Sequence, residues 1–303
     1  MIKIDKARDK VAIIAPASGV KNEQWKMDRA LSFARLQDTI NFFEQHDLQC
    51  VYDKEIFSVD VLQFFASSKE ERIRQLKEAL EDPSVKIIHA FRGGYGCLDM
   101  AFDCLEIEPS GPKILIGFSD ITILHLLFNQ CYNFQSIHGV MCPKEPEMLE
   151  EVIDVLGGKD VKIQLQPLRP QQQESNTRGE MIGGNLAVLC SSIGTSLHPN
   201  TDGKILFLED IHEKDYQIHR YLVQMYNAGL FKEVKALVFG EFVESGMGSG
   251  LAIESFVNEY LPNVPVYSTN SIGHGKINRP IIMGGSGEID GDLLTVFSPF
   301  KYI

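Results

Sequence analysis

The first half of the chain alternates short apolar runs with helical patterns, and this constrains the possible folds more than any other feature. The strand-like runs are KVAIIAP, LQCVYD, KIIHAF and KILIGF. The strongest helical pattern follows Ser67, with Ser68 as the expected N-cap and Glu71 three residues later. Parallel strands joined by crossover helices produce such alternation. We therefore predict an α/β fold whose N-terminal half is a parallel sheet flanked by helices.

The composition changes near Pro143, where PKEPEMLEEV restarts a helical pattern. We place a domain boundary there, which gives an N-terminal domain of residues 1–143 and a C-terminal domain of residues 144–303. The second half contains further strand-like runs and three helical stretches, one from Asn185, one over residues 216–228 and one after the glycine-rich loop at residues 245–250. Its tail predicts paired strands around Asp290 and Gly291, because Asp-Gly is typical of tight hairpin turns.

The charge balance excludes several classes of partner. The chain of 303 residues has 41 acidic and 29 basic residues, a formal net charge of −12. Binding to nucleic acid or to an anionic membrane surface requires a basic face, so we expect neither partner. No apolar run reaches the roughly 18–20 residues of a membrane span, and the N-terminus lacks the pattern of a signal peptide, so we expect a cytoplasmic protein. The six cysteines form no CxxC pair, which favours free thiols over a metal site.

Ser119 lies between the strand-like run KILIGF and the helical run ITILHLLF. A serine at such a turn either caps the helix or acts as a nucleophile beside helix N-terminal amides that stabilise an oxyanion. The stretch GFSDI has the first glycine of a G-x-S-x-G nucleophile elbow and lacks the second. The pentapeptide alone leaves both interpretations open.

Two glycine-flanked segments are further candidates. FRGGYG, residues 91–96, follows a strand and matches no phosphate-loop pattern, so it is either a packed turn or a backbone cradle for an oxyanion or carboxylate. In GHG, His274 follows the strand-like run PVYSTN, and its small neighbours leave the ring accessible, as a general base requires. By contrast, His125 lies in an apolar helix and is predicted to be a satisfied core or boundary residue.

A general-base histidine needs a carboxylate that fixes its tautomer, and the stretch LFLEDIHEKD supplies several. Glu209 and Asp210 end an apolar strand, whereas Glu213 and Asp215 begin the next helix, where the helix dipole already favours acidic residues. Glu209 is therefore the better candidate.

These segments together resemble the LD-carboxypeptidase family of serine peptidases, which includes muramoyltetrapeptide carboxypeptidases and microcin C self-immunity peptidases. The matching segments occur in the family's order between residues 91 and 275: FRGGYG, KILIGFSDIT, HGVM, GEMIGGNLAVL, LFLEDIHEKDYQIHRYLVQM and GHG. The resemblance implies an N-terminal parallel sheet with helices and a smaller, barrel-like C-terminal α/β domain, with the site between them. It implies no metal and no organic cofactor, and we also expect a homodimer.

Carried over residue by residue, the resemblance makes Ser119 the nucleophile, His274 the general base and Glu209 the acid that orients it. The backbone N–H groups of Asp120 and of the Gly93–Gly94 turn would form the oxyanion hole. A carboxypeptidase must also bind the free carboxylate of its substrate, and Arg92 beside the glycine turn is our hypothesis for that contact.

The resemblance leaves the substrate open. The enzyme would remove a terminal D-residue from a murein tetrapeptide in cell-wall recycling, or cleave a peptidyl-nucleotide antibiotic as in the immunity branch. That branch is implied to stack its nucleotide on an aromatic side chain, and here no aromatic residue occurs between Phe134 and Phe207, while Trp25 is far upstream. The loop of residues 166–178 offers amides and arginines instead, so we favour the murein peptide. The third hypothesis is that the protein is a non-catalytic, peptide-binding member of the fold.

Overall fold

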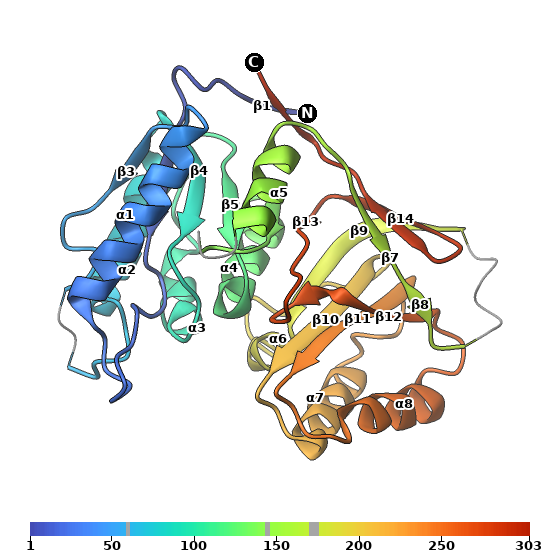
Figure 1. Cartoon of the computed structure of the whole chain (residues 1–303). Coiled ribbons are helices and arrows are strands. Elements are labelled where there is room, and N and C mark those ends of the chain that lie inside the picture. Colours follow the sequence, from blue (N-terminus) through green and yellow to red (C-terminus); the bar gives the residue numbers. More distant parts are fainter. Residues whose placement is uncertain (59–60, 143–145, 170–175) are drawn as a thin grey trace. The chain divides into compact units, whose positions relative to one another are not determined.

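The computed structural model describes residues 1–303 except 59–60, 143–145 and 170–175, and it divides into two compact units (Figure 1). The first unit is Met1–Lys159 with Pro299–Ile303, and the second is Asp160–Ser298. The boundary expected at Pro143 falls on residues outside the described part of the chain, so a division there stays a prediction. The helix after it, α5 (Pro146–Leu156), is part of the first unit.

The first unit contains the parallel sheet that the alternating pattern predicts. Its strands are hydrogen-bonded in the order β6-β5-β4-β2-β3, and each neighbouring pair is parallel. The bounds are β2 Lys10–Ile14, β3 Cys50–Tyr52, β4 Val85–Ala90, β5 Ile114–Gly117 and β6 Ser136–His138. Strands β2, β4 and β5 carry the apolar runs named above and are buried along most of their length. These strands are therefore the core of the unit.

The helices of the first unit are α1 Arg29–Gln45, α2 Lys69–Glu81, α3 Cys97–Ala101, α4 Thr122–Leu126 and α5, with short helical turns η1 Phe102–Cys104, η2 Ser119–Ile121 and η3 Leu127–Cys131. Of these, α2, α4 and α5 lie on the helical patterns named above, whereas α3 was not predicted. The predicted cap of α2 is confirmed, because Ser68 Oγ accepts a hydrogen bond of 3.2 Å from the amide of Glu71. The two ends of the chain meet in this unit (Figure 1), where β1 (Ile2–Ile4) pairs in parallel with β16 (Phe300–Tyr302).

The second unit is built on a sheet of eight strands in the order β7-β15-β14-β9-β10-β11-β12-β8. The bounds are β7 Val161–Gln164, β8 Gln166–Pro167, β9 Asn176–Asn185, β10 Ile205–Ile211, β11 Ala236–Val243, β12 Val266–Gly273, β14 Ser286–Asp290 and β15 Leu293–Val296. Strands β7 and β8 lie at opposite ends of this order, yet only Leu165 separates them in the chain. The sheet must therefore curl until its two edges meet, which gives the nearly closed, barrel-like sheet that we expected.

The middle of this sheet is parallel, and helices cross over between its strands. Strands β9, β10, β11 and β12 pair in parallel, and α6 Leu186–Ser191, α7 Asp215–Asn227 and α8 Ser249–Tyr260 connect them. Helices α7 and α8 pack side by side (Figure 1). The predicted hairpin is confirmed, because β14 and β15 are antiparallel and Gly291 has φ +61° in their turn. Strand β13 spans Ile281–Met283.

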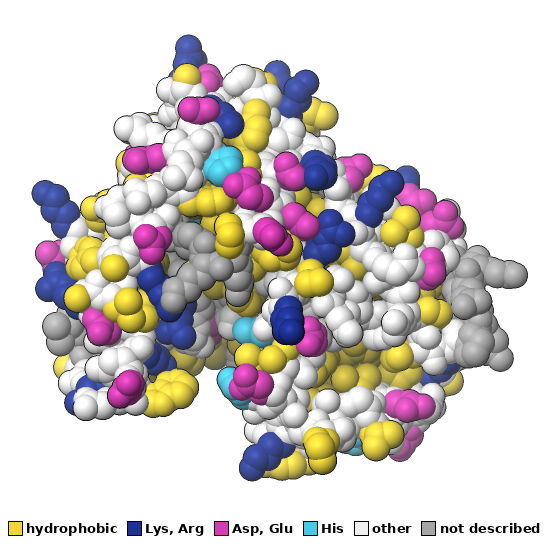
Figure 2. All heavy atoms as spheres, in the orientation of Figure 1, with side chains coloured by type: hydrophobic (Ala, Val, Ile, Leu, Met, Phe, Trp, Pro, Cys, Tyr) yellow, Lys and Arg dark blue, Asp and Glu magenta, His cyan; other side chains and the backbone are white. Residues whose placement is uncertain are grey.

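Acidic and basic side chains are intermixed over the face that Figure 2 shows. All six cysteines are free, as the sequence predicts, and Cys97, Cys104 and Cys190 are buried. Within the described ranges, no helix is both long and apolar enough to cross a membrane.

Gly183 is the tightest backbone contact in the second unit and yields a test of the fold. Its φ is +146°, and a Cβ there would lie 1.9 Å from the carbonyl oxygen of Phe207 on the neighbouring strand. Gly183→Ala should therefore lower the free energy of unfolding by about 3 kcal/mol or more. Gly194→Ala is the matched control, because Gly194 has φ +82° and open space around it. That control should cost only about 1 kcal/mol. Equal losses in urea denaturation would contradict the steric account.

Candidate active site

Ser119 lies at the turn between β5 and α4 with a left-handed backbone, φ +66°. An L-residue rarely adopts this conformation, and it is typical of strained functional turns. Gly117 makes the turn possible, because a Cβ there would lie 2.8 Å from the side chain of Ile121. Neither η2 nor α4 has a side-chain cap, so Ser119 Oγ is not a helix cap. The structural alternative of the sequence analysis is therefore wrong, and the half-buried hydroxyl is available for chemistry.

The FRGGYG turn packs directly against this serine. A Cβ on Gly93 would lie 2.9 Å from Ser119 Cβ and 3.2 Å from Ser119 Oγ, so only glycine permits the contact. Gly94 has φ +115°, and a Cβ there would lie 2.5 Å from Ser18 Oγ. Within the described residues, neither the Gly93 nor the Gly94 amide donates a hydrogen bond. The turn thus brings two amides without acceptors to the vicinity of the serine.

Asp120, the residue after Ser119, connects the turn to the serine through its side chain. Its buried carboxylate accepts a hydrogen bond of 2.8 Å from the amide of Cys97, at the start of α3. Arg72, which is fully buried, donates to the carbonyl oxygens of Pro16 and Gly96 on the same loops. Burial raises the pKa of the Asp120 carboxyl to about 6, although the Cys97 amide and Arg72 both favour its charged form.

Glu209 and His274 form a pair in the second unit. His274 Nδ1 lies 2.6 Å from Glu209 Oε2, with the glutamate fully buried and the histidine side chain 13% exposed. The sheet register shifts between Leu208 and Asp210 in β10, at Glu209 itself. Such a bulge redirects the side chain of the extra residue. Gly273 completes the arrangement, because a Cβ there would lie 2.9 Å from Glu209.

Asp210 and Glu213 are the neighbouring acids, and Asp210 has other partners. Asp210 accepts hydrogen bonds from Asn185 Nδ2 and from the amides of Ala187 and Ile211, and burial raises its pKa to about 6. Glu213 precedes α7, and burial raises the pKa of its carboxyl. Of the acids considered in the sequence, the structure brings Glu209 to His274. His125 is satisfied in the core, as predicted, by Ser136 Oγ and the Gly117 carbonyl oxygen.

Arg92, the proposed carboxylate-binding residue, lines a cavity of about 420 Å³. The lining residues are Val20, Lys21, Asn22, Glu23, Trp25, Arg35 and Arg92. One Arg92 nitrogen, Nη1, donates a 2.7 Å hydrogen bond to the Gly19 carbonyl oxygen. Lys21 and Arg35 carry no signal in the sequence that marks them as site residues. Trp25, although far upstream of the other candidate residues in the chain, also lines this cavity and is 75% exposed.

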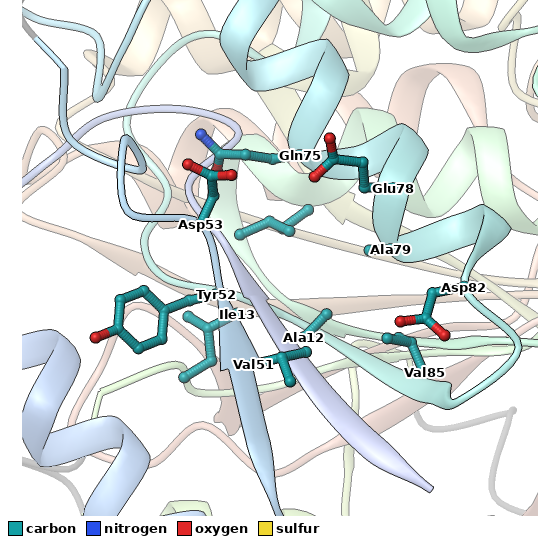
Figure 3. A pocket seen from close by; sticks show the side chains of 11 residues that line it. Ala12, Ile13, Val51, Tyr52, Asp53, Gln75, Glu78, Ala79, Asp82 and Val85 are labelled. Carbon is teal, nitrogen blue, oxygen red and sulfur yellow. The ribbon is translucent and has the colours of Figure 1, made fainter.

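A second cavity, of about 200 Å³, runs along β2, β3 and α2 (Figure 3). Asp53, Glu78 and Asp82 lie around it, and Arg74 pairs with Asp53 and Glu78. None of the predicted site residues lines this cavity. Among residues 1–58, 61–142, 146–169 and 176–303, no three His, Cys, Asp or Glu side chains converge as metal ligands.

Comparisons with known proteins identify the family of the chain. Residues 11–139 match the family model of the LD-carboxypeptidase N-terminal domain, and residues 178–289 match that of the C-terminal domain. A protein of Rickettsia conorii is 33% identical over 290 residues, which covers 92% of this chain and 87% of its own length. The chain belongs to the LD-carboxypeptidase family. This is a family of serine peptidases, and the comparisons support a carboxypeptidase.

Solved structures share the LD-carboxypeptidase fold. A muramoyltetrapeptide carboxypeptidase from Oxalobacter formigenes is 27% identical, with a TM-score of 0.76 over 96% of this chain and 99% of that one. A microcin C7 self-immunity protein in complex with aspartyl sulfamoyl adenosine has a TM-score of 0.76 over 97% of both chains. At 17% identity it shows the fold alone.

Asp120 gives this member of the LD-carboxypeptidase family a pH-dependent stability that can be tested. Since its folded pKa is raised above the unfolded value of ~3.9, the native state binds more protons between pH ~4 and ~6. The wild type therefore loses stability relative to Asp120→Asn as pH rises through that window, and the difference is constant above it. Urea denaturation of both proteins at pH 4.5 and pH 7 measures this. A difference that is the same at both pH values would show that Asp120 does not titrate there.

Proposed function

We propose that the protein is a metal-independent serine LD-carboxypeptidase that removes the terminal D-residue from murein tetrapeptides through an acyl-enzyme. The observation that carries the proposal is the 2.6 Å pair between His274 Nδ1 and Glu209 Oε2. A buried carboxylate that accepts from Nδ1 fixes the tautomer in which Nε2 is the basic nitrogen. Ser119, on its strained and uncapped turn, supplies the hydroxyl that such a base activates.

In the proposed acylation step, Ser119 Oγ attacks the carbonyl carbon of the bond between the L-centre and the D-residue. His274 Nε2 accepts the Oγ proton and then donates it to the leaving amine, while Glu209 stabilises the imidazolium. The amides of Gly93, Gly94 and Asp120 would stabilise the oxyanion, and the free amides of the glycine turn support this assignment. Water then attacks the ester carbonyl while His274 accepts a proton from it, and His274 donates that proton to Ser119 Oγ as the ester bond breaks and the shortened peptide leaves as the free acid.

An exopeptidase also needs a cation for the free carboxylate of the leaving residue. We assign this contact to Arg92. It directly precedes Gly93, whose backbone packs against Ser119, so its backbone belongs to the same turn, and its guanidinium reaches the Gly19 carbonyl oxygen at the neighbouring cavity. A planar guanidinium binds a carboxylate with two parallel hydrogen bonds, which fixes the end of a peptide in position.

The peptidyl-nucleotide substrate is the second candidate, and one observation favours it. Trp25 is exposed beside Arg92 and presents the aromatic surface on which a nucleobase could stack. We retain the murein peptide as first candidate because the muramoyltetrapeptide carboxypeptidase is more similar in sequence than the self-immunity protein. Of the loop at residues 166–178, whose amides favoured a peptide, residues 170–175 lie outside the described part of the chain.

Ser119→Ala tests the nucleophile. The purified wild type should release D-alanine from a free tetrapeptide that ends in D-alanine. Ser119→Ala should lower kcat by roughly 10⁴-fold or more, because the acyl-enzyme cannot form. Ser191→Ala, on the surface of α6, is the control and should retain full activity. A wild type that binds the peptide without cleaving it would instead support a non-catalytic member of the fold.

Glu209→Gln tests the orienting acid. The amide should lower kcat by roughly 10³–10⁴-fold, since it cannot stabilise the imidazolium, while the unfolding midpoint changes little. Glu213→Gln, also near the end of the same strand, is the matched control and should cost less than tenfold. If kcat falls further in Glu213→Gln than in Glu209→Gln, the assignment of Glu209 is wrong.

A further inference from the structure

Three cationic side chains of the first unit converge on the cavity beside Arg92, in a chain whose net charge is −12. They are Lys21, Arg35 on α1, and Arg92 on the glycine turn. None of the three makes an ion pair with any described residue. Glu23 also lines the cavity and is exposed to solvent. Three cations at one cavity without an ion pair among the described residues repel one another, so the cluster needs an explanation.

Arg35 has a buried side-chain nitrogen without a hydrogen-bond acceptor among the described residues. Its Nε is buried, and no hydrogen-bond acceptor for it lies within the part of the chain that the structure describes. Arg35 also lines a third cavity together with Asp38 and Cys142, and it forms no ion pair with Asp38. Leaving a buried charged donor without an acceptor costs free energy. A ligand oxygen at this position would remove that cost.

The trio is also electrostatically strained. Burial and the charge of Arg92 lower the pKa of Lys21, and burial and the charge of Arg35 lower the pKa of Arg92. Among the described residues, the hydrogen bond of the cluster runs from Arg92 Nη1 to the Gly19 carbonyl oxygen, and Lys21 Nζ lies 5.3 Å from the centre of the Trp25 ring. Like charges held together without a counter-ion favour an anionic ligand.

We propose that Lys21, Arg35 and Arg92 form a subsite for an anionic oxyacid group of the substrate, with Arg35 as a specificity-determining residue. This inference rests on the proposed function and deepens it. The group is the free carboxylate of a peptide end or the phosphoryl group of a peptidyl nucleotide, since both present oxygens to a guanidinium fork. Arg92 connects the subsite to the glycine turn at Ser119, and a volume of about 420 Å³ accommodates a residue-sized group.

Steady-state kinetics of Arg35→Gln separates this role from a structural one. With the tetrapeptide that ends in D-alanine, KM should rise about 10- to 100-fold while kcat changes less than threefold, and Arg35→Lys should recover part of the loss. The same peptide with a terminal amide should show no difference between wild type and Arg35→Gln. Arg29→Gln, on the same helix and outside the cavity lining, is the matched control and should behave as wild type. The unfolding midpoint of Arg35→Gln should not fall, because Arg35 Nε gives up no hydrogen bond.

Two further experiments determine whether the subsite binds a carboxylate or a phosphoryl group. They also separate this inference from the proposed function. A peptidyl-adenylate mimic whose KM depends on Arg35 more than that of the tetrapeptide would assign the subsite to a phosphoryl group. Calorimetry on Ser119→Ala with the tetrapeptide and with inorganic phosphate measures the subsite without turnover. Wild-type cleavage with identical KM values in Arg35→Gln and Arg29→Gln would overturn the subsite and leave the proposed function standing. Arg35-dependent binding without wild-type cleavage would retain the subsite and overturn the proposed function.

Discussion

The left-handed backbone at Ser119 is the constraint on which the rest of the first unit depends. An L-residue in this conformation costs about 1–2 kcal/mol, and the surrounding structure must hold it there. Gly117 and Gly93 leave the space for the turn, and the Asp120 carboxylate holds the start of α3 beside it. The parallel sheet provides the rigid frame, since β5 is buried along its whole length. The strained serine is thus fixed by its neighbours and is not a loop residue free to relax.

In the second unit, the main constraint is a carboxylate that is buried beside a histidine. Glu209 is fully buried, and burial of an unpaired charge is costly. The contact with His274 offsets part of that cost, and one carboxylate oxygen, Oε1, has no partner among the described residues. A charge held in this way strengthens its effect on the neighbouring ring, because the local dielectric is low. The arrangement favours positioning of a base over stability.

Electrostatics links these features to substrate choice. The protein is acidic overall, so general attraction cannot bring a peptide with free carboxylates to it. In our proposal local cations do so, and Lys21, Arg35 and Arg92 line one cavity of the first unit without an ion pair among the described residues. Trp25, exposed at the same cavity, adds an aromatic surface beside the charge. We therefore expect substitutions at this cavity to discriminate between the two candidate substrates.

Local patterns in the sequence determined the elements, because helix caps, apolar periods and Asp-Gly turns act within a few residues. Ser68, the parallel strands and the hairpin at Gly291 followed from such patterns, and the ordered motifs identified the family. Features that depend on packing between distant parts of the chain were determined only by the tertiary structure. The register shift at Glu209 requires the pairing of β10 with β11, and the curl of the second sheet requires β7 and β8 to meet. Trp25, Arg35 and Arg92 converge across more than 60 residues of chain, and no periodicity marks them, because only the completed sheet brings α1 and the glycine turn together.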